Sequence, residues 1–185
     1  IKLMNNNKSY NTIYLITGII LIGIISRLIP NNIPNFSAVG AVALFAGNYI
    51  KNTQLRYSIP IIAMCISDLL LSFLGTGLAS PIVQISVYGS FFLTILIGTI
   101  DFKNLSKFIS IPITSVFAAL VFFIITNFAV WLNGWYGYTL EGLITCYTVA
   151  IPYFGNTILG NLTYSIILFG SYEYIKLKST NLATR

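Results

Sequence analysis

The chain contains no histidine, only four acidic residues and only two cysteines among its 185 residues. Without histidine, it lacks the commonest general base and the commonest metal ligand of proteins. Cys65 and Cys146 form no CxxC or other metal-ligand spacing, so we interpret them as small buried hydrophobic residues. The sequence also has no GxGxxG or P-loop motif. These absences argue against an enzyme and predict neither a cofactor nor a metal ion.

Charge of either sign is scarce. Charged residues make up 8% of the chain and hydrophobic residues 56%, and the mean hydropathy is +0.84. A soluble domain carries about 25% charged residues. The composition therefore predicts an integral membrane protein, and the length suits one compact bundle rather than several domains.

The apolar runs predict an all-α bundle of six transmembrane helices, since a span needs about 20 apolar residues. The expected helices cover 12–29, 36–50, 57–76, 81–100, 108–132 and 155–175. The second run is short, so we expect it to be buried or partly re-entrant. We expect a single domain over 12–176, flanked by an N-terminal tail, 1–11, and a C-terminal tail, 177–185; residues 1–3, ahead of Met4, are set aside.

The segment 133–154 is the ambiguous part of the chain. It is apolar enough to enter the membrane partly, but Gly134, Gly137, Glu141 and Pro152 interrupt it. We expect a re-entrant or interfacial segment between the fifth and sixth helices.

The basic residues predict the orientation in the membrane. With six spans, nine of the ten fall on one side, and Arg27 is the exception. The nine are Lys2, Lys8, Lys51, Arg56, Lys103, Lys107, Lys176, Lys178 and Arg185. The positive-inside rule makes that side cytoplasmic, so both termini are expected inside, and 75–80 and 133–154 outside. The net charge of +6 is thus a topology signal and does not indicate nucleic-acid binding.

Three charged residues fall inside expected spans, and one of them, Glu173, has Lys176 three residues on as an ordinary helix-surface partner. Arg27 and Asp68 have no such explanation. At about 1.5 Å per residue, Asp68 lies near the middle of its span and Arg27 about 6 Å from it in depth. An unpaired charge there costs at least about 2.5–3.5 kcal/mol, so such residues usually face a partner or a wet cavity. We expect an ion pair in an outward-opening pocket, with Asn35 as a neutral neighbour. Alternatively, Arg27 reaches outward to the interface and Asp68 is protonated or bonded to a neighbouring helix.

Amides and aromatic rings gather near the outer end of the fifth expected helix. Amides and ring planes suit a flat, polar, ring-containing ligand, whereas an interfacial belt also enriches Trp and Tyr. Besides Arg27, Asn35 and Asp68, the candidate ligand-binding residues are Asn127, Trp131, Trp135, Tyr136, Glu141 and Asn156.

Small residues recur at helical spacing in the second expected helix, at Gly40, Ala43 and Gly47. Small residues let helices approach closely in lipid. Spacing alone favours packing within the bundle over the alternative, a face that docks a partner.

Three stretches carry a resemblance to a known group of proteins. These are "SRLIPNNIPNFSAVGAVALFAG", "SDLLL" and the long run that begins "TNFAVWLNGWYGYTLEGL". They resemble an uncharacterised family of small bacterial integral membrane proteins, which is similar to the substrate-binding S components of energy-coupling-factor (ECF) transporters.

The resemblance implies a six-helix bundle in the bacterial cytoplasmic membrane that binds a small molecule from outside. Its pocket would be capped by the loops between helices one and two and between five and six. It also implies docking on an ECF-type transmembrane partner driven by ATPases, for which Gly40, Ala43 and Gly47 would be the contact.

We therefore expect membrane-embedded binding and uptake of a vitamin-like or nucleobase-like molecule. The alternative is a small structural subunit of a larger membrane complex, with lipid and protein as its partners. An intramembrane enzyme ranks lowest, since Arg27, Asp68 and Glu141 are too few to specify a reaction.

Overall fold

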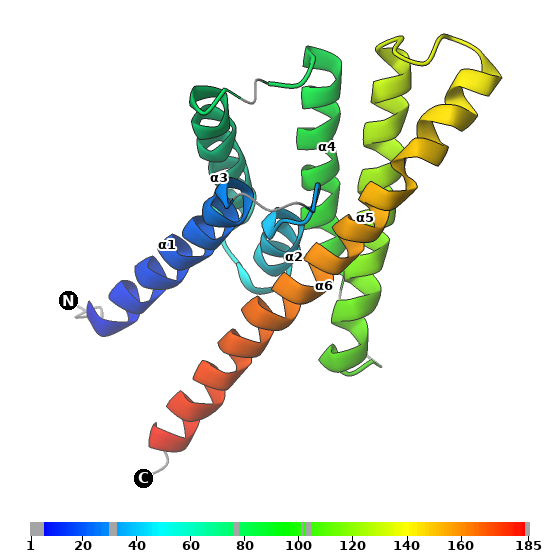
Figure 1. The fold of residues 1–185 in the computed structure, drawn as a ribbon. Coiled ribbons are helices and arrows are strands. Elements are labelled where there is room, and N and C mark those ends of the chain that lie inside the picture. Colours follow the sequence, from blue (N-terminus) through cyan, green and yellow to red (C-terminus); the bar gives the residue numbers. More distant parts are fainter. Residues whose placement is uncertain (1–5, 30–32, 76–77, 101, 103–104, 184–185) are drawn as a thin grey trace.

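The fold is all-helical in the part of the chain that the computed structural model describes, residues 6–29, 33–75, 78–100, 102 and 105–183. It contains six helices there (Figure 1). They are α1 (Asn6–Leu28), α2 (Val39–Tyr49), α3 (Thr53–Phe73), α4 (Pro81–Gly98), α5 (Lys107–Leu132) and α6 (Leu140–Ala183). The prediction of an all-α fold is confirmed.

Four of these helices are long and apolar enough to cross a membrane, namely α3, α4, α5 and the stretch Leu140–Tyr174 of α6. The described apolar stretch of α1, Tyr14–Leu28, and the whole of α2 are shorter. The helices thus support a membrane protein, and four of them qualify as spans on length and composition alone.

Local signals explain several helix ends. Asn52 caps α3, because its side-chain oxygen accepts a hydrogen bond from the backbone N–H of Leu55 at 3.0 Å. Pro81 opens α4, where its missing N–H costs no helical hydrogen bond. After α5 the chain turns at Gly134, whose φ of +84° favours glycine.

The largest difference from the sequence-based prediction concerns α6, which begins at Leu140 rather than at residue 155. Residues 140–154 are the first turns of one 44-residue helix, and the structure does not show a re-entrant segment within 133–154. Pro152 lies inside this helix without ending it. In an apolar environment a loop would leave backbone groups unpaired, so a helix is favoured even across a proline.

The length of α6 affects how it fits a bilayer. At about 1.5 Å per residue, its 44 residues measure roughly twice the ~30 Å hydrocarbon core. Figure 1 shows α6 running obliquely across the bundle relative to α4 and α5. The helix must therefore tilt strongly, extend beyond the core, or both.

The helix ends fall at two ends of the bundle. In Figure 1, α3 and α5 end and α4 and α6 begin at the upper end, whereas α1 begins and α6 ends at the lower end. The connections that the charge pattern assigns to the extracytoplasmic side therefore start and finish at the same end of the molecule.

The short helix α2 lies at the centre of the bundle, and every residue from Val39 to Gly47 is buried. It contacts α1, α3, α4, α5 and α6. Gly47 packs directly on α4, where an added Cβ would overlap the Ile95 carbonyl and approach the Gly98 backbone to 2.9 Å. Gly40 and Ala43 are equally buried. These contacts favour a role for the small residues in packing within the bundle rather than in docking a partner.

A polar cluster joins three helices toward the lower end. The hydroxyl of Tyr49 donates to Glu173 Oε1 at 2.5 Å, and Lys107 Nζ lies 2.9 Å from the same oxygen. The ammonium group also lies 4.3 Å from the centroid of the Tyr49 ring. This cluster connects the end of α2, the start of α5 and the second half of α6.

Candidate ligand site

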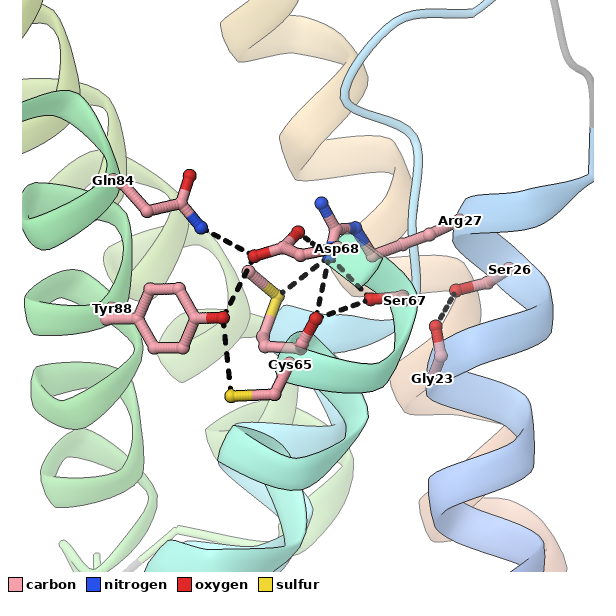
Figure 2. A network of polar contacts seen from close by, with 9 residues as sticks. Gly23, Ser26, Arg27, Cys65, Ser67, Asp68, Gln84 and Tyr88 are labelled. Carbon is pink, nitrogen blue, oxygen red and sulfur yellow. Dashed lines mark hydrogen bonds and ion pairs between the residues drawn. The ribbon is translucent and has the colours of Figure 1, made fainter. Parts of the chain in front are cut away.

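Arg27, in the last turn of α1, forms an ion pair with Asp68 in the C-terminal third of α3 (Figure 2). The Nη1–Oδ1 distance is 2.6 Å. The predicted pairing is thus present, and it brings together two residues 41 positions apart in the chain. Asp68 is buried and Arg27 is partly exposed.

Asp68 is held from a second direction by α4. Gln84 Nε2 donates to Asp68 Oδ2 at 2.5 Å, and the Tyr88 hydroxyl donates to the same oxygen at 2.9 Å (Figure 2). Hydrogen bonds to an ionised acceptor are stronger than neutral ones. The carboxylate therefore connects α1, α3 and α4 and has partners on both oxygens.

Arg27 makes all its contacts with α3 through one nitrogen. Besides Asp68, Nη1 donates to Ser67 Oγ at 2.5 Å and lies 3.5 Å from the Met64 carbonyl oxygen. Ser67 Oγ in turn donates to that carbonyl at 2.9 Å. The guanidinium group is thus fixed against α3 on one edge.

Arg27 borders a cavity of about 530 Å³ that all six helices line. Such a volume falls within the range of roughly 300–1,000 Å³ typical of small-molecule pockets. The lining includes Arg27 from α1, Gly40 from α2, Met64 from α3, Phe91 from α4, Phe122 from α5 and Asn161 from α6. Among the lining residues in the described part of the chain, Arg27 alone carries a charge.

A second hollow of about 240 Å³ lies beside the first and shares Asn35, Val87, Phe122 and Thr157 with it. Asn127 lines only this smaller space, where its side-chain nitrogen donates to the Phe123 carbonyl at 2.7 Å. The two spaces together extend the site from α1 toward α5 and α6.

Residues 33–37, between α1 and α2, form one wall of the cavity. Ser26 Oγ accepts a hydrogen bond from the Ala38 N–H at 2.9 Å, and Asn156 Nδ2 donates to the Pro34 carbonyl at 3.0 Å. An added Cβ at Gly160 would lie 3.0 Å from the Ser37 nitrogen. The wall is thus attached to α1 on one side and to α6 on the other.

Asn161 is the buried amide of this site. Its Nδ2 donates to the Ser115 carbonyl at 3.2 Å, and an added Cβ at Gly40 would overlap its side-chain oxygen. The absence of a side chain at Gly40 therefore leaves room for the Asn161 amide at the cavity wall.

The structure gathers some of the predicted site residues and separates others. Arg27 and Asn35 line the large cavity, Asn127 lines the small one, Asp68 backs Arg27, and Asn156 holds the loop wall. Four others line neither space: Trp131, Trp135, Tyr136 and Glu141.

The aromatic residues after Asn127 lie near the end of α5 and in the turn that follows it. Trp131 packs against Phe128 and Tyr138, with ring centroids 5.5 and 6.3 Å away. Trp135 is 67% exposed. This position favours an interfacial belt for these rings over a place in the cavity wall.

Sequence reasoning missed Gln84 and Tyr88 as site residues. Gln84 and Tyr88 are four residues apart and so share one face of α4. Two hydrogen-bonding side chains on one face of an otherwise apolar helix are a signal that could have identified them.

The fold and the cavity define a helical protein of membrane-spanning character with an internal polar site. The chain belongs to a family of unknown function, DUF6580, which it matches over residues 7–182. No curated protein and no solved structure matches it. The expectation of an uncharacterised family is confirmed, and the match does not link that family to ECF S components.

Proposed function

We propose that this protein binds a small vitamin-like or nucleobase-like molecule within the membrane and takes part in its uptake, in the manner of an S component. One observation supports this most directly: a cavity of about 530 Å³ lined by all six helices, with Arg27 at its wall. A packing role alone does not require so large a space among the helices, because protein interiors are normally close-packed.

The proposal includes a setting in the bacterial cytoplasmic membrane. All six helices would cross or enter the bilayer, with both termini in the cytoplasm, because nine of the ten basic residues then face inward. The cavity includes Leu74, just after α3, and residues of the α1–α2 connection. Access would then be from the extracytoplasmic side.

Uptake against a gradient needs a source of energy. The sequence has no P-loop, so an ECF-type transmembrane partner with ATPases would supply it. Such a partner would contact surfaces other than Gly40, Ala43 and Gly47, which are buried in the bundle.

Cysteine labelling tests the proposed topology. With Cys65 and Cys146 replaced by alanine, we expect Ala79→Cys and Tyr138→Cys to react with an impermeant maleimide on intact cells. Lys51→Cys should react only after permeabilisation. All three native side chains are exposed. External labelling at position 51, or labelling of positions 79 and 138 on different sides, would overturn the topology.

A matched pair of tryptophan substitutions in α4 tests binding in the cavity. Val87 lines both hollows, whereas Ile85 is 73% exposed. Val87→Trp should remove binding because the indole occupies the space, and Ile85→Trp should retain it. Native mass spectrometry of the protein extracted in mild detergent, with a vitamin and metabolite panel, measures the bound small molecule.

The same experiment can contradict the proposed function. Equal occupancy in both variants would place the ligand elsewhere. A stable stoichiometric assembly with other membrane subunits, with no bound small molecule, would favour the structural-subunit alternative.

A further inference from the structure

Within the part of the chain that the structure describes, one edge of the Arg27 guanidinium group has no partner, and we call it the free edge. Its contacts with Asp68, Ser67 and Met64 all use Nη1. Among the described residues, no partner contacts Nη2 or Nε. Figure 2 draws the second terminal nitrogen without a dashed line. Since Arg27 lines the large cavity, this edge is available to a molecule bound there.

The site around that edge is electrically neutral. Asp68 compensates the charge of Arg27 at 2.6 Å, and the described cavity lining contains no other charged side chain. A bound carboxylate would add a negative charge beside an arginine that Asp68 already neutralises, and a bound ammonium group would face an arginine. Either ion would therefore lack a full counter-charge, which is costly wherever the site excludes water.

Most of the remaining wall is apolar and partly aromatic. Phe36, Phe91 and Phe122 all line the cavity, together with aliphatic side chains such as Leu28 and Val39. Aromatic walls suit a ring system, and the few polar groups of such a pocket fix its orientation.

Building on the proposed function, we infer that the ligand is a neutral, flat, ring-containing molecule whose carbonyl oxygen accepts hydrogen bonds from the free edge of Arg27. Asp68 is then a positioning residue. It holds the guanidinium group in place and cancels its charge, while Gln84 and Tyr88 hold Asp68. Cyclic amides and ring ketones belong to this chemical class, and amino acids, polyamines and phosphorylated compounds do not.

Three bicyclic probes of similar size test the inference: quinolin-2-one, quinoline-2-carboxylate and 2-(aminomethyl)quinoline. They carry a neutral carbonyl, an anion and a cation. Binding is measured by calorimetry on the full chain in lipid nanodiscs. We expect quinolin-2-one to bind about tenfold or more tightly than either ion, the scale of one charge-assisted hydrogen bond.

Arg27→Lys tests the role of the free edge separately from that of the ion pair. Lysine keeps a positive charge for Asp68 but loses the planar fork of donors. We expect the variant to remain folded and to lose most of the preference for quinolin-2-one. Ile85→Trp, on an exposed face of α4, serves as the variant that retains the preference.

The outcomes separate this inference from the proposed function. Tightest binding of the carboxylate, or an unchanged preference in Arg27→Lys, would contradict the inference that the ligand is a neutral carbonyl compound. Neither result would contradict the proposal that a small molecule binds in the cavity. The same holds if no probe binds while the metabolite panel finds an occupant that Val87→Trp displaces. If neither experiment finds an occupant, both proposals fail.

Discussion

Asp68→Asn is expected to destabilise the protein by about 3–5 kcal/mol, the usual cost of removing one partner from a buried ion pair. The substitution leaves Arg27 without its counter-charge next to an apolar cavity. It also places an amide where three donors converge, from Arg27, Gln84 and Tyr88. An amide nitrogen cannot accept a hydrogen bond, so at least one donor must lose its partner.

Arg27→Gln should cost less than Asp68→Asn. In that variant Asp68 retains Gln84 and Tyr88 as donors, and the new glutamine amide can still donate. The structure therefore predicts an asymmetric pair, in which the acid matters more than the base.

A double-mutant cycle measures the coupling within the pair. The Arg27→Gln/Asp68→Asn variant should lose less stability than the sum of the single variants, because no charge remains unpaired. Glu141→Gln is the matched control: Glu141 is exposed at the start of α6, and its neutralisation should change stability by less than about 0.5 kcal/mol. Unfolding is followed against SDS mole fraction in mixed micelles. Strict additivity would contradict the ion pair.

The best-predicted helices are those whose ends or apolar runs are clear in the sequence. The expected spans 81–100 and 108–132 correspond to α4 (Pro81–Gly98) and α5 (Lys107–Leu132). Pro81 marks the first start, and a long uninterrupted apolar run marks the second. The start of α6 was wrong because glycine, glutamate and proline in 133–154 indicate a loop by water-based propensities. The tertiary environment and the demand for paired backbone groups outweigh them.

The ion pair was predictable because an unpaired intramembrane charge is expensive. The spacing of Gln84 and Tyr88 places both on one face of α4, but the helix that this face meets depends on how α4 is rotated against α3. The same limit explains the residues near the end of α5. Asn127 and Trp131 are four residues apart on one helix, yet Asn127 borders the small hollow and Trp131 packs against Phe128 and Tyr138 instead. Sequence spacing gives the approximate face of a helix but not which of its residues meet a cavity.

Gly47→Ala is the substitution from which we expect the largest loss of packing. An added Cβ would meet the Ile95 carbonyl and the Gly98 backbone at less than 3 Å. Both neighbours are backbone, so no flexible side chain can move aside, and α2 has no free direction because it is buried along Val39–Gly47. Overpacking typically costs about 1–3 kcal/mol, and this site should reach or exceed the upper end.

Two further glycine-to-alanine substitutions provide the comparison, one inside the contact between α2 and α4 and one outside it. Gly98→Ala should be comparably damaging, because its Cβ would approach the Leu44 backbone at 2.5 Å. Gly89→Ala, on an exposed face of α4 with no atom within 4 Å of the added Cβ, should be neutral or stabilise the helix by up to about 1 kcal/mol. The three variants are compared in the SDS unfolding assay. If Gly47→Ala and Gly98→Ala behave like Gly89→Ala, then α2 and α4 do not meet backbone to backbone, and the central position of α2 would be wrong.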